Sequence, residues 1–325
     1  MNGLPLRVGV IGCGAIGHQH AVRLSRISGV SVAALSDPSR AAMERTASEL
    51  PAAPETMSED YRIPLGQGLD AVCIASPDAY HVEQALAALR AGCHVLCEKP
   101  LTPWVQELET VRREVARSGR IMAMTYQRRY DGAHRALRRE ILSGTWGEVT
   151  GIAIHGAEDW ITPNAGTWRH DPAICPGGFF YDACGHQIDM VLWATDLRGQ
   201  SVQAWTENAG TAVPIRIWGN AILSNGAPMT FHFVGDATAW RETIHIHCTD
   251  RDFAIRDYKP EAIVDGASQP FAPGSAQAGS DVEFIQMIRE GAQNPAPVED
   301  VRRVLRFTEA ALRSAATGNV TEALP

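Results

Sequence analysis

Two segments of the chain carry side chains that could move a proton to or from a substrate. The first is Glu98-Lys99-Pro100, which follows a short apolar run, and the second is segment 177–189, which holds Asp182 and His186. Histidine titrates near neutral pH and suits general acid–base chemistry, while a lysine ammonium can stabilise a developing alkoxide. Both also have a purely structural interpretation, as a solvated strand-end lysine and as a structural His–Asp network. The residue types alone leave both interpretations open.

Helical spacing predicts which side chains of segment 177–189 share one face of a helix. If 180–195 is a helix, Asp182, His186 and Asp189 follow at i, i+4 and i+7 and form one polar stripe. We expect this stripe to point away from the core and towards a substrate. Cys184 is turned away from it and is interpreted as a packing residue. The roughly opposite side is mostly apolar and consists of Ile188, Val191, Leu192 and Thr195.

Segment 12–17, Gly-Cys-Gly-Ala-Ile-Gly, fits a dinucleotide-binding loop. It leaves one apolar run and opens a helical pattern, as the GxGxxG motif requires. Gly12 permits the tight turn, Gly14 lets the backbone approach a pyrophosphate, and Gly17 lets the helix pack closely on the sheet. Ala15 and Ile16 then open a helix whose N-terminus would face the phosphates. A merely structural glycine turn is the weaker alternative.

Asp37 lies 20 residues after Gly17, at the end of the second apolar run. A carboxylate there accepts hydrogen bonds from ribose hydroxyls and repels the extra phosphate of NADP, so the sequence favours NAD. Arg40 could soften that repulsion, which leaves NADP as the less favoured cofactor. A helix N-cap before Pro38 is a structural alternative compatible with either cofactor.

Two other kinds of dehydrogenase site find little support. No tyrosine is followed four residues later by lysine, which excludes the YxxxK pair of short-chain dehydrogenases. His245 and His247 would share one face of a strand beside Cys248, but a catalytic zinc needs three protein ligands and no third is evident. We therefore expect no metal.

Composition excludes several classes of partner. The 325 residues include 29 Lys plus Arg and 37 Asp plus Glu, a formal charge of −8, which argues against nucleic acid or an anionic membrane as partner. No apolar run reaches the roughly 18 residues of a membrane span. The first strand pattern begins at Leu6, so we expect no signal peptide. Seven scattered cysteines without a CxxC pair predict reduced thiols in the cytoplasm.

The order of segments predicts two domains. Short apolar runs alternate with helical patterns up to about residue 125, which indicates a Rossmann-type, doubly wound parallel α/β sheet in domain 1–124. Domain 125–325 has a strand at 148–158, a helix at 180–195 and alternating runs between 201 and 257, which indicates an α+β fold with a mainly antiparallel sheet. Residues 259–280 are expected to form a loop before two closing helices. The apolar runs of the first domain are 6–12, 30–36, 70–76, 93–98 and 120–125.

Motifs along nearly the whole chain resemble those of the Gfo/Idh/MocA oxidoreductases. They are GCGAIG, the loop 76–81 (SPDAYH), AGCHVLCEKPL at 91–101, YQRRYDGAH at 126–134, Trp168-Arg169, and GGFFYDACGHQID at 177–189. The resemblance implies that Lys99 lies near the nicotinamide and the reacting hydroxyl, that His186 is the catalytic acid–base, and that Asp182 is its companion on the substrate. The family's third glycine before the GG pair is replaced here by Pro176.

The resemblance also implies cofactor, substrate and assembly. Cofactor contacts are expected from Ser76, Pro77, His81, Glu98 and Lys99, beside the glycine loop, Asp37 and Arg40. The open sheet is expected to form a homodimer or homotetramer. The preferred hypothesis is an NAD-dependent dehydrogenase of a sugar or cyclitol; an NAD-using glycosidase and a non-catalytic NAD-binding regulator are the alternatives. Substrate contacts are expected from Tyr126, Arg128, His155, Trp168 and Arg169, with Trp160 as a further neighbour.

Overall fold

The computed structural model describes residues 5–272 and 279–324, which form two compact units. The first unit consists of residues 5–102, 106–125 and 279–301, and the second of residues 103–105, 126–272 and 302–324. The chain passes between the units at residues 125 and 126, close to the boundary expected at 124. Residues 279–301 differ from that expectation because they return to the first unit. Helical periodicity shows that a segment is amphipathic but does not show which core it covers.

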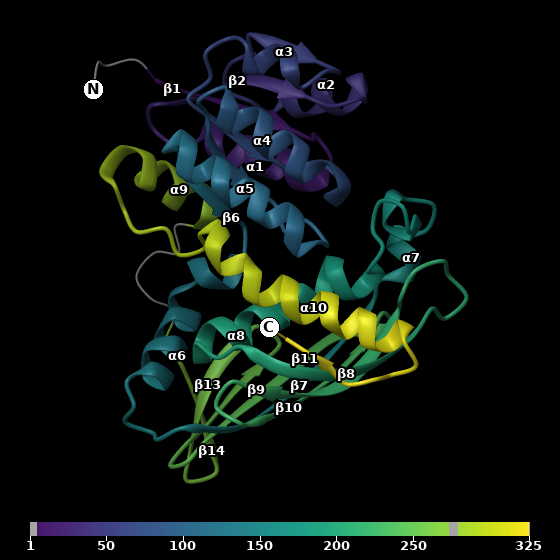
Figure 1. Ribbon diagram of the computed structural model, residues 1–325. Coiled ribbons are helices and arrows are strands. Elements are labelled where there is room, and N and C mark those ends of the chain that lie inside the picture. Colours follow the sequence, from purple (N-terminus) through teal and green to yellow (C-terminus); the bar gives the residue numbers. More distant parts are fainter. Residues whose placement is uncertain (1–4, 273–278, 325) are drawn as a thin grey trace. The chain divides into compact units, whose positions relative to one another are not determined.

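The first unit is built on a six-stranded parallel sheet with the order β3-β2-β1-β4-β5-β6 (Figure 1). Its central strands are buried on both faces, which explains their continuous apolar sequences. Five of the strands were predicted from the sequence, and the short β3 was not. Their bounds are β1 Leu6–Ile11, β2 Val30–Ser36, β3 Thr56–Ser58, β4 Ala71–Ile74, β5 His94–Cys97 and β6 Met122–Met124.

Helices connect these strands, so their carboxyl ends share one edge of the sheet. Gly12, Asp37, Ser76 and Glu98 each follow a strand at that edge, where open α/β sheets bind ligands. Helix α1 buries Ala21 and Leu24 against the sheet. The helices are α1 Ala15–Ser25, α2 Arg40–Ser48, α3 Arg62–Leu65, α4 His81–Arg90, α5 Val105–Ser118 and α9 Gly279–Glu290, with 3₁₀ turns at Asp78–Tyr80 and Val298–Asp300.

The second unit is built on a nine-stranded sheet with the order β14-β13-β12-β11-β7-β10-β9-β8-β15. All neighbouring strands are antiparallel except β7 and β10, which agrees with the mainly antiparallel sheet that the sequence predicts. The strands are β7 Val149–Asp159, β8 Gly199–Glu207, β9 Arg216–Leu223, β10 Pro228–Val234, β11 Asp236–Cys248, β12 Asp252–Arg256, β13 Lys259–Val264, β14 Ala267–Pro270 and β15 Glu322–Ala323.

Helices α8 and α10 cover one face of this sheet, and both lie on the same side of it in Figure 1. The rings of Phe231 in β10 and Phe307 in α10 are 5.6 Å apart. Along β9 the side chains alternate between buried and exposed, and the other face exposes Trp218 and Ile222. The remaining helices are α6 Gly132–Leu142, α7 Ile161–Asn164, α8 Gly185–Thr195 and α10 Val301–Ala316, with 3₁₀ turns at Gln127–Tyr130 and Trp168–His170.

The prediction of a loop over 259–280 was wrong for its first part, because β13 and β14 form a hairpin there. Asp265 and Gly266 make the turn with φ of +50° and +77°, as a two-residue hairpin of type I′ requires. Ser, Gln and Pro fill the exposed edge strand β14, so its composition resembles that of a loop. Residues 273–278 of the expected loop lie outside the described residues.

Across residues 5–272 and 279–324, none of the helices combines the length and the apolar character that a membrane crossing requires.

Candidate active site

The glycine loop has the geometry that a pyrophosphate site needs. Gly12 has φ of +88°, and a Cβ on it would lie 2.6 Å from the backbone of Ala75 and Ser76. A Cβ on Gly17 would lie 1.8 Å from the carbonyl oxygen of Gly12, so helix and strand meet without room for a side chain. Gly14 has open space around it and caps α1 without a side-chain hydrogen bond. This N-terminus therefore fits an anionic group.

Exposure of the loop follows the same pattern. Gly14, Ala15 and Ile16 are exposed in succession between the buried Cys13 and Gly17. A ligand can therefore reach the backbone at the first turn of α1.

Asp37 is held beside this loop. Its Oδ2 accepts a hydrogen bond from the backbone N–H of Cys13 at 2.7 Å, and its Oδ1 accepts one from Ser39 at 2.7 Å. The N-cap of α2 is Ser39, whose Oγ accepts from Ala42, so the N-cap role considered for Asp37 belongs to Ser39. The Asp37 carboxylate is thus fixed at the end of β2, where a ribose is recognised in this kind of fold.

Two arginines of α2 differ in their contacts. Arg40 pairs with Glu44 at 2.9 Å on the exposed side of the helix. Arg45 donates from Nη2 to the carbonyl oxygen of Cys13 at 3.0 Å. Arg45 therefore stabilises the glycine loop through a hydrogen bond that the sequence spacing did not predict.

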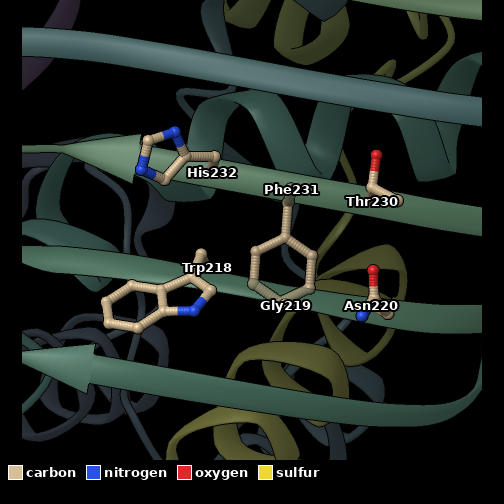
Figure 2. Close-up of a pocket in the computed structure, with 6 residues that line it drawn as sticks. All are labelled: Trp218, Gly219, Asn220, Thr230, Phe231 and His232. Atoms are coloured by element: carbon tan, nitrogen blue, oxygen red, sulfur yellow. The ribbon is translucent and has the colours of Figure 1, made fainter.

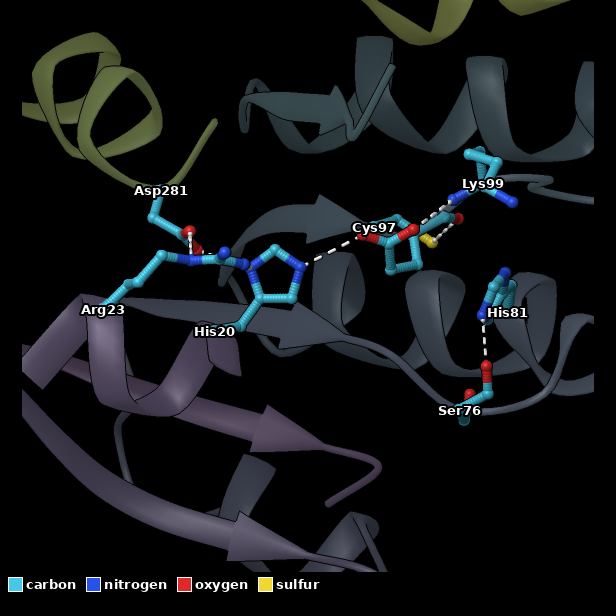
Figure 3. Close-up of polar contacts among 8 residues, drawn as sticks. His20, Arg23, Ser76, His81, Cys97, Lys99 and Asp281 are labelled. Carbon is cyan, nitrogen blue, oxygen red and sulfur yellow. Dashed lines mark hydrogen bonds and ion pairs between the residues drawn. The ribbon is translucent and has the colours of Figure 1, made fainter. Parts of the chain in front are cut away.

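The loop after β4 is tied to the end of β5 through His81. The Nε2 atom of this buried histidine lies 2.7 Å from the carbonyl oxygen of Ser76 (Figure 3). Its Nδ1 atom lies 2.7 Å from the carbonyl oxygen of Pro100. Burial lowers the pKa of His81. The Ser76 hydroxyl donates to Gln84 at 2.6 Å, and Pro77 precedes the 3₁₀ turn. His81 thus packs between the backbone after β4 and the backbone after β5, and its single ring N–H can donate to one of the two carbonyl oxygens.

Lys99 lies between two fixed residues. Its backbone N–H donates to Glu98 Oε2 at 3.2 Å, and its peptide bond to Pro100 is cis. Burial of Glu98 favours its neutral form, but the hydrogen bond from His20 and the charges of His20 and Lys99 outweigh this and lower the pKa of Glu98. A carboxylate therefore adjoins Lys99.

In the second unit, Asp182 accepts two hydrogen bonds on one oxygen. Trp160 Nε1 donates to Asp182 Oδ2 at 2.8 Å, and Arg169 Nε donates to the same oxygen at 2.7 Å. Arg169 also lies over the ring of Trp168, 4.4 Å from its centroid. Trp160 and Arg169 therefore contact Asp182 directly, and Trp168 lies beside Arg169. Their contact with a substrate stays a prediction. The ring of Trp160 packs against His170 and Phe179.

The helix that carries His186 has an irregular start. Residues Phe180–Cys184 form a π-helical turn, and the regular helix α8 begins at Gly185. Such turns are rare and frequently occur at functional sites. Between residues 181 and 195 only Ala183 and His186 are partly exposed, so the histidine is accessible on an otherwise buried helix.

The third member of the expected polar stripe has a different role. Asp189 is buried and accepts from Nη2 and Nε of Arg129 at 2.6 and 2.9 Å. The ring of buried Tyr126 lies 5.4 Å from the Arg129 guanidinium. Arg128 is buried as well, with both Nη groups on Glu242 and its guanidinium over the ring of Tyr258. These contacts give Arg128 a structural partner that the sequence did not indicate.

His155 lies on the other face of the sheet from α8. Its neighbour Gly156 faces α8, since a Cβ there would lie 3.6 Å from Gln187 Nε2, and strand alternation turns His155 the opposite way. Its ring is instead 5.4 Å from that of His232. His155 therefore lies on the face of the sheet opposite to α8, the helix that carries His186, and we leave His155 out of the site.

No metal cluster is found in the described parts of the chain, where no three His, Cys, Asp or Glu side chains are placed to hold an ion. His245 and His247 stack on each other at 6.1 Å, and His247 pairs with Asp252 at 3.0 Å.

Comparison with known families identifies the class of both halves of the chain. Residues 6–126 match the oxidoreductase family with an NAD-binding Rossmann fold, and residues 134–253 match the GFO/IDH/MocA C-terminal domain. The chain therefore belongs to the Gfo/Idh/MocA oxidoreductase family, and its first unit has the NAD-binding Rossmann fold. The glycine loop and Asp37 fit that cofactor.

Individual relatives agree with this family. Inositol 2-dehydrogenase 4 of Saccharopolyspora erythraea is 32% identical over 211 residues, which cover 63% of this chain and 57% of that protein. The 1,5-anhydro-D-fructose reductase of Ensifer adhaerens is 28% identical over 78% of this chain and 80% of that protein. The chain thus spans less than two thirds of the length of the inositol dehydrogenase it matches.

A solved structure of levoglucosan dehydrogenase, in complex with NADH and L-sorbose, has the same fold. It superposes with a TM-score of 0.85 at 20% sequence identity and covers 99% of both chains.

Proposed function

We propose that this protein is an NAD-dependent dehydrogenase of a sugar, sugar derivative or cyclitol. The observation that carries the proposal is the Asp37 carboxylate fixed beside the glycine loop, together with the Asp182–Trp160–Arg169 contacts one turn before His186. The first arrangement suits a ribose with free hydroxyls. The second orients a carboxylate next to an accessible histidine. The named relatives act on inositol and on anhydrofructose, which supports this substrate class.

Each residue has a proposed role in alcohol oxidation. The glycine loop, Asp37 and the loop that begins at Ser76 would hold NAD, which would supply the hydride acceptor. Neutral His186 takes the hydroxyl proton as the C–O bond becomes a carbonyl, and Lys99 stabilises negative charge developing on that oxygen. Asp182 binds a second substrate hydroxyl and orients the ring of His186. An acid–base group of this kind contributes about 10²- to 10⁴-fold to the rate.

The test is an absorbance assay at 340 nm with NAD and NADP, each offered against inositols, aldoses, sugar acids and nucleotide sugars. We expect NADH formation with one of these classes, and a loss of about 10²- to 10⁴-fold in His186→Ala with NADH affinity retained. Full activity in His186→Ala would refute its role. NADH binding without turnover in either direction would favour a regulator. Hydrolysis of a glycoside without net NADH would favour the NAD-using glycosidase.

We further propose a homo-oligomer in which a second copy covers the exposed sheet face. Support comes from Trp218 and Ile222, 37% and 41% exposed on this face, and from a shallow hollow beside them lined by Trp218, Asn220, Thr230 and His232 (Figure 2). Light scattering after size exclusion should give a dimer or tetramer for the wild type and a smaller species for Trp218→Asp. Ile63→Asp, at an exposed apolar site in the first unit, is the control.

A reducing compartment, the cytoplasm, is proposed from the cysteines. All seven are buried with free thiols. Fractionation of the source cells tests this location.

A further inference from the structure

A buried histidine in the first unit lies between two carboxylates. His20 of α1 is 1% exposed; its Nδ1 is 2.5 Å from Asp281 Oδ1 and its Nε2 is 3.1 Å from Glu98 Oε1 (Figure 3). A carboxylate oxygen accepts hydrogen bonds, so each ring nitrogen satisfies its contact only when it carries a proton. The geometry is therefore that of an imidazolium.

The charges around His20 balance one another. Arg23, one turn along α1, donates from Nε to Asp281 Oδ2 at 2.7 Å, so two cations face two carboxylates. Burial opposes protonation of His20, but Cys73 of β4, Asp281 of α9 and Glu98 after β5 outweigh it and raise the pKa of His20. A buried charge is tolerated in this way when it is paired and hydrogen-bonded. The contacts with two carboxylates and the raised pKa both favour the imidazolium form of His20.

Glu98 connects His20 to the backbone of Lys99. One oxygen of Glu98 contacts His20, and the other accepts the backbone N–H of Lys99 at 3.2 Å. On the other side of Lys99, the carbonyl oxygen of Pro100 lies 2.7 Å from Nδ1 of the buried His81. The backbone of Lys99 is thus hydrogen-bonded on its Glu98 side and packed against a buried histidine on the other. A cluster that served only to attach α9 would need His20 and Asp281 but not Glu98.

We propose that His20 is a positioning residue for Lys99. Its imidazolium holds the carboxylate of Glu98, and that carboxylate holds the backbone from which the lysine side chain extends. His20 itself touches neither substrate nor cofactor in this proposal. The inference rests on the proposed function, because it takes the role of Lys99 from there.

The test compares His20→Asn with His18→Asn on the same helix. His18 contacts Thr46 and Glu49 rather than the Glu98 cluster, at 3.2 and 3.4 Å. A displaced catalytic group can cost up to about 100-fold in rate, so we expect kcat of His20→Asn to fall by about 10- to 100-fold, with a smaller change in KM. His18→Asn should keep the wild-type kcat.

The pH profile separates positioning from a merely structural role. Loss of the His20 charge removes a cause that lowers the pKa of Glu98. Protonation of His186 sets the first fall of kcat on the acid side, and protonation of Glu98 should add a second fall below it. In His20→Asn this second ionisation should lie closer to neutral pH and make the acid limb steeper than in the wild type. If His20→Asn does not fold, Glu98→Gln replaces it. This variant keeps an oxygen for the Lys99 N–H but loses the charge that attracts His20, and we expect kcat to fall in the same range.

Lys99→Ala distinguishes the positioning role of His20 from the role of Lys99 in the proposed function. If Lys99→Ala is inactive while a folded His20→Asn keeps the wild-type kcat and acid limb, the positioning role is wrong and the proposed function stands. If Lys99→Ala remains fully active, the role of Lys99 is wrong and the positioning role falls with it. Inactive Lys99→Ala with a slow His20→Asn that has the steeper acid limb supports both.

Discussion

Asp37→Asn tests how the first unit chooses its cofactor. The substitution keeps the size of the side chain but removes the charge and leaves one oxygen to serve the N–H groups of Cys13 and Ser39, each now 2.7 Å from a carboxylate oxygen. The new amide cannot both hold the loop in this way and accept from two ribose hydroxyls. NAD should therefore lose affinity, while the repulsion of the NADP phosphate disappears.

The magnitude follows from the type of bond that is lost. A hydrogen bond to a charged group contributes about 1.5–3 kcal/mol, which corresponds to about 10- to 150-fold in affinity. We expect NADH to bind more weakly by this factor and the NAD-to-NADP ratio of kcat/KM to fall by at least tenfold. The unpaired N–H of Cys13 or Ser39 should also lower the free energy of unfolding by about 1–3 kcal/mol.

The assay is a fluorescence titration with NADH and with NADPH, followed by kcat/KM for both cofactors at a temperature where each variant is folded. Asp70→Asn is a matched control, since Asp70 accepts the backbone N–H of Arg7 at 2.8 Å away from the glycine loop. It should lower stability without changing the cofactor ratio. An unchanged ratio in Asp37→Asn, with normal NADH affinity, would refute the assignment of Asp37 to the ribose.

Three further predictions concern residues that support the folded structure of each unit. Gly17→Ala should abolish NADH binding or folding, because its Cβ would lie 1.8 Å from the Gly12 carbonyl oxygen. Gly66→Ala is the control, since its Cβ would lie at an ordinary 3.5 Å from the Ile63 carbonyl oxygen. Both variants are checked by circular dichroism and NADH titration. Glu242→Gln should lower the free energy of unfolding by about 3–5 kcal/mol in urea, since it leaves the buried Arg128 charge without its carboxylate, whereas exposed Glu207→Gln should change it little. The pKa of His20 is raised in the folded state, so its contribution to the free energy of unfolding is complete below about pH 6.5 and declines as pH rises through the folded-state pKa. Urea unfolding between pH 6 and 10 should show this decline in the wild type. An equal decline in His20→Asn would contradict the prediction.

The sequence predicted best those features that depend on neighbours along the chain. The glycine loop, the strand before it and Asp37 lie within 32 residues of one another, from Leu6 to Asp37, and the βαβ pattern dictates their arrangement. The helix of His186 was also predicted, although its π-helical first turn was not. Runs of alternating residues between 201 and 257 predicted the mainly antiparallel sheet of the second unit, and β9 shows the matching alternation of buried and exposed side chains.

Contacts between distant residues could not be predicted in this way. His20 and Asp281 are 261 positions apart, and Arg128 and Glu242 are 114 apart, so no spacing rule relates them. Arg128 was expected to contact the substrate, because a sequence shows the charge of a side chain but not its burial. The β13–β14 hairpin was missed because an exposed edge strand needs few apolar residues.

The return of residues 279–301 to the first unit has a consequence for how the protein is made. As the chain leaves the ribosome, His20 and Glu98 emerge early, but their partner Asp281 follows only after the whole sheet from β7 to β14. The edge strand β6 likewise cannot pair its backbone until Ala296 has been translated, because the carbonyl oxygen of Ala296 accepts the backbone N–H of Met124. The cofactor-binding unit therefore cannot complete its fold during synthesis until nearly all of the second unit has been translated. A fragment that ends at residue 125 would carry every glycine of the loop and still lack the helix that neutralises its buried histidine.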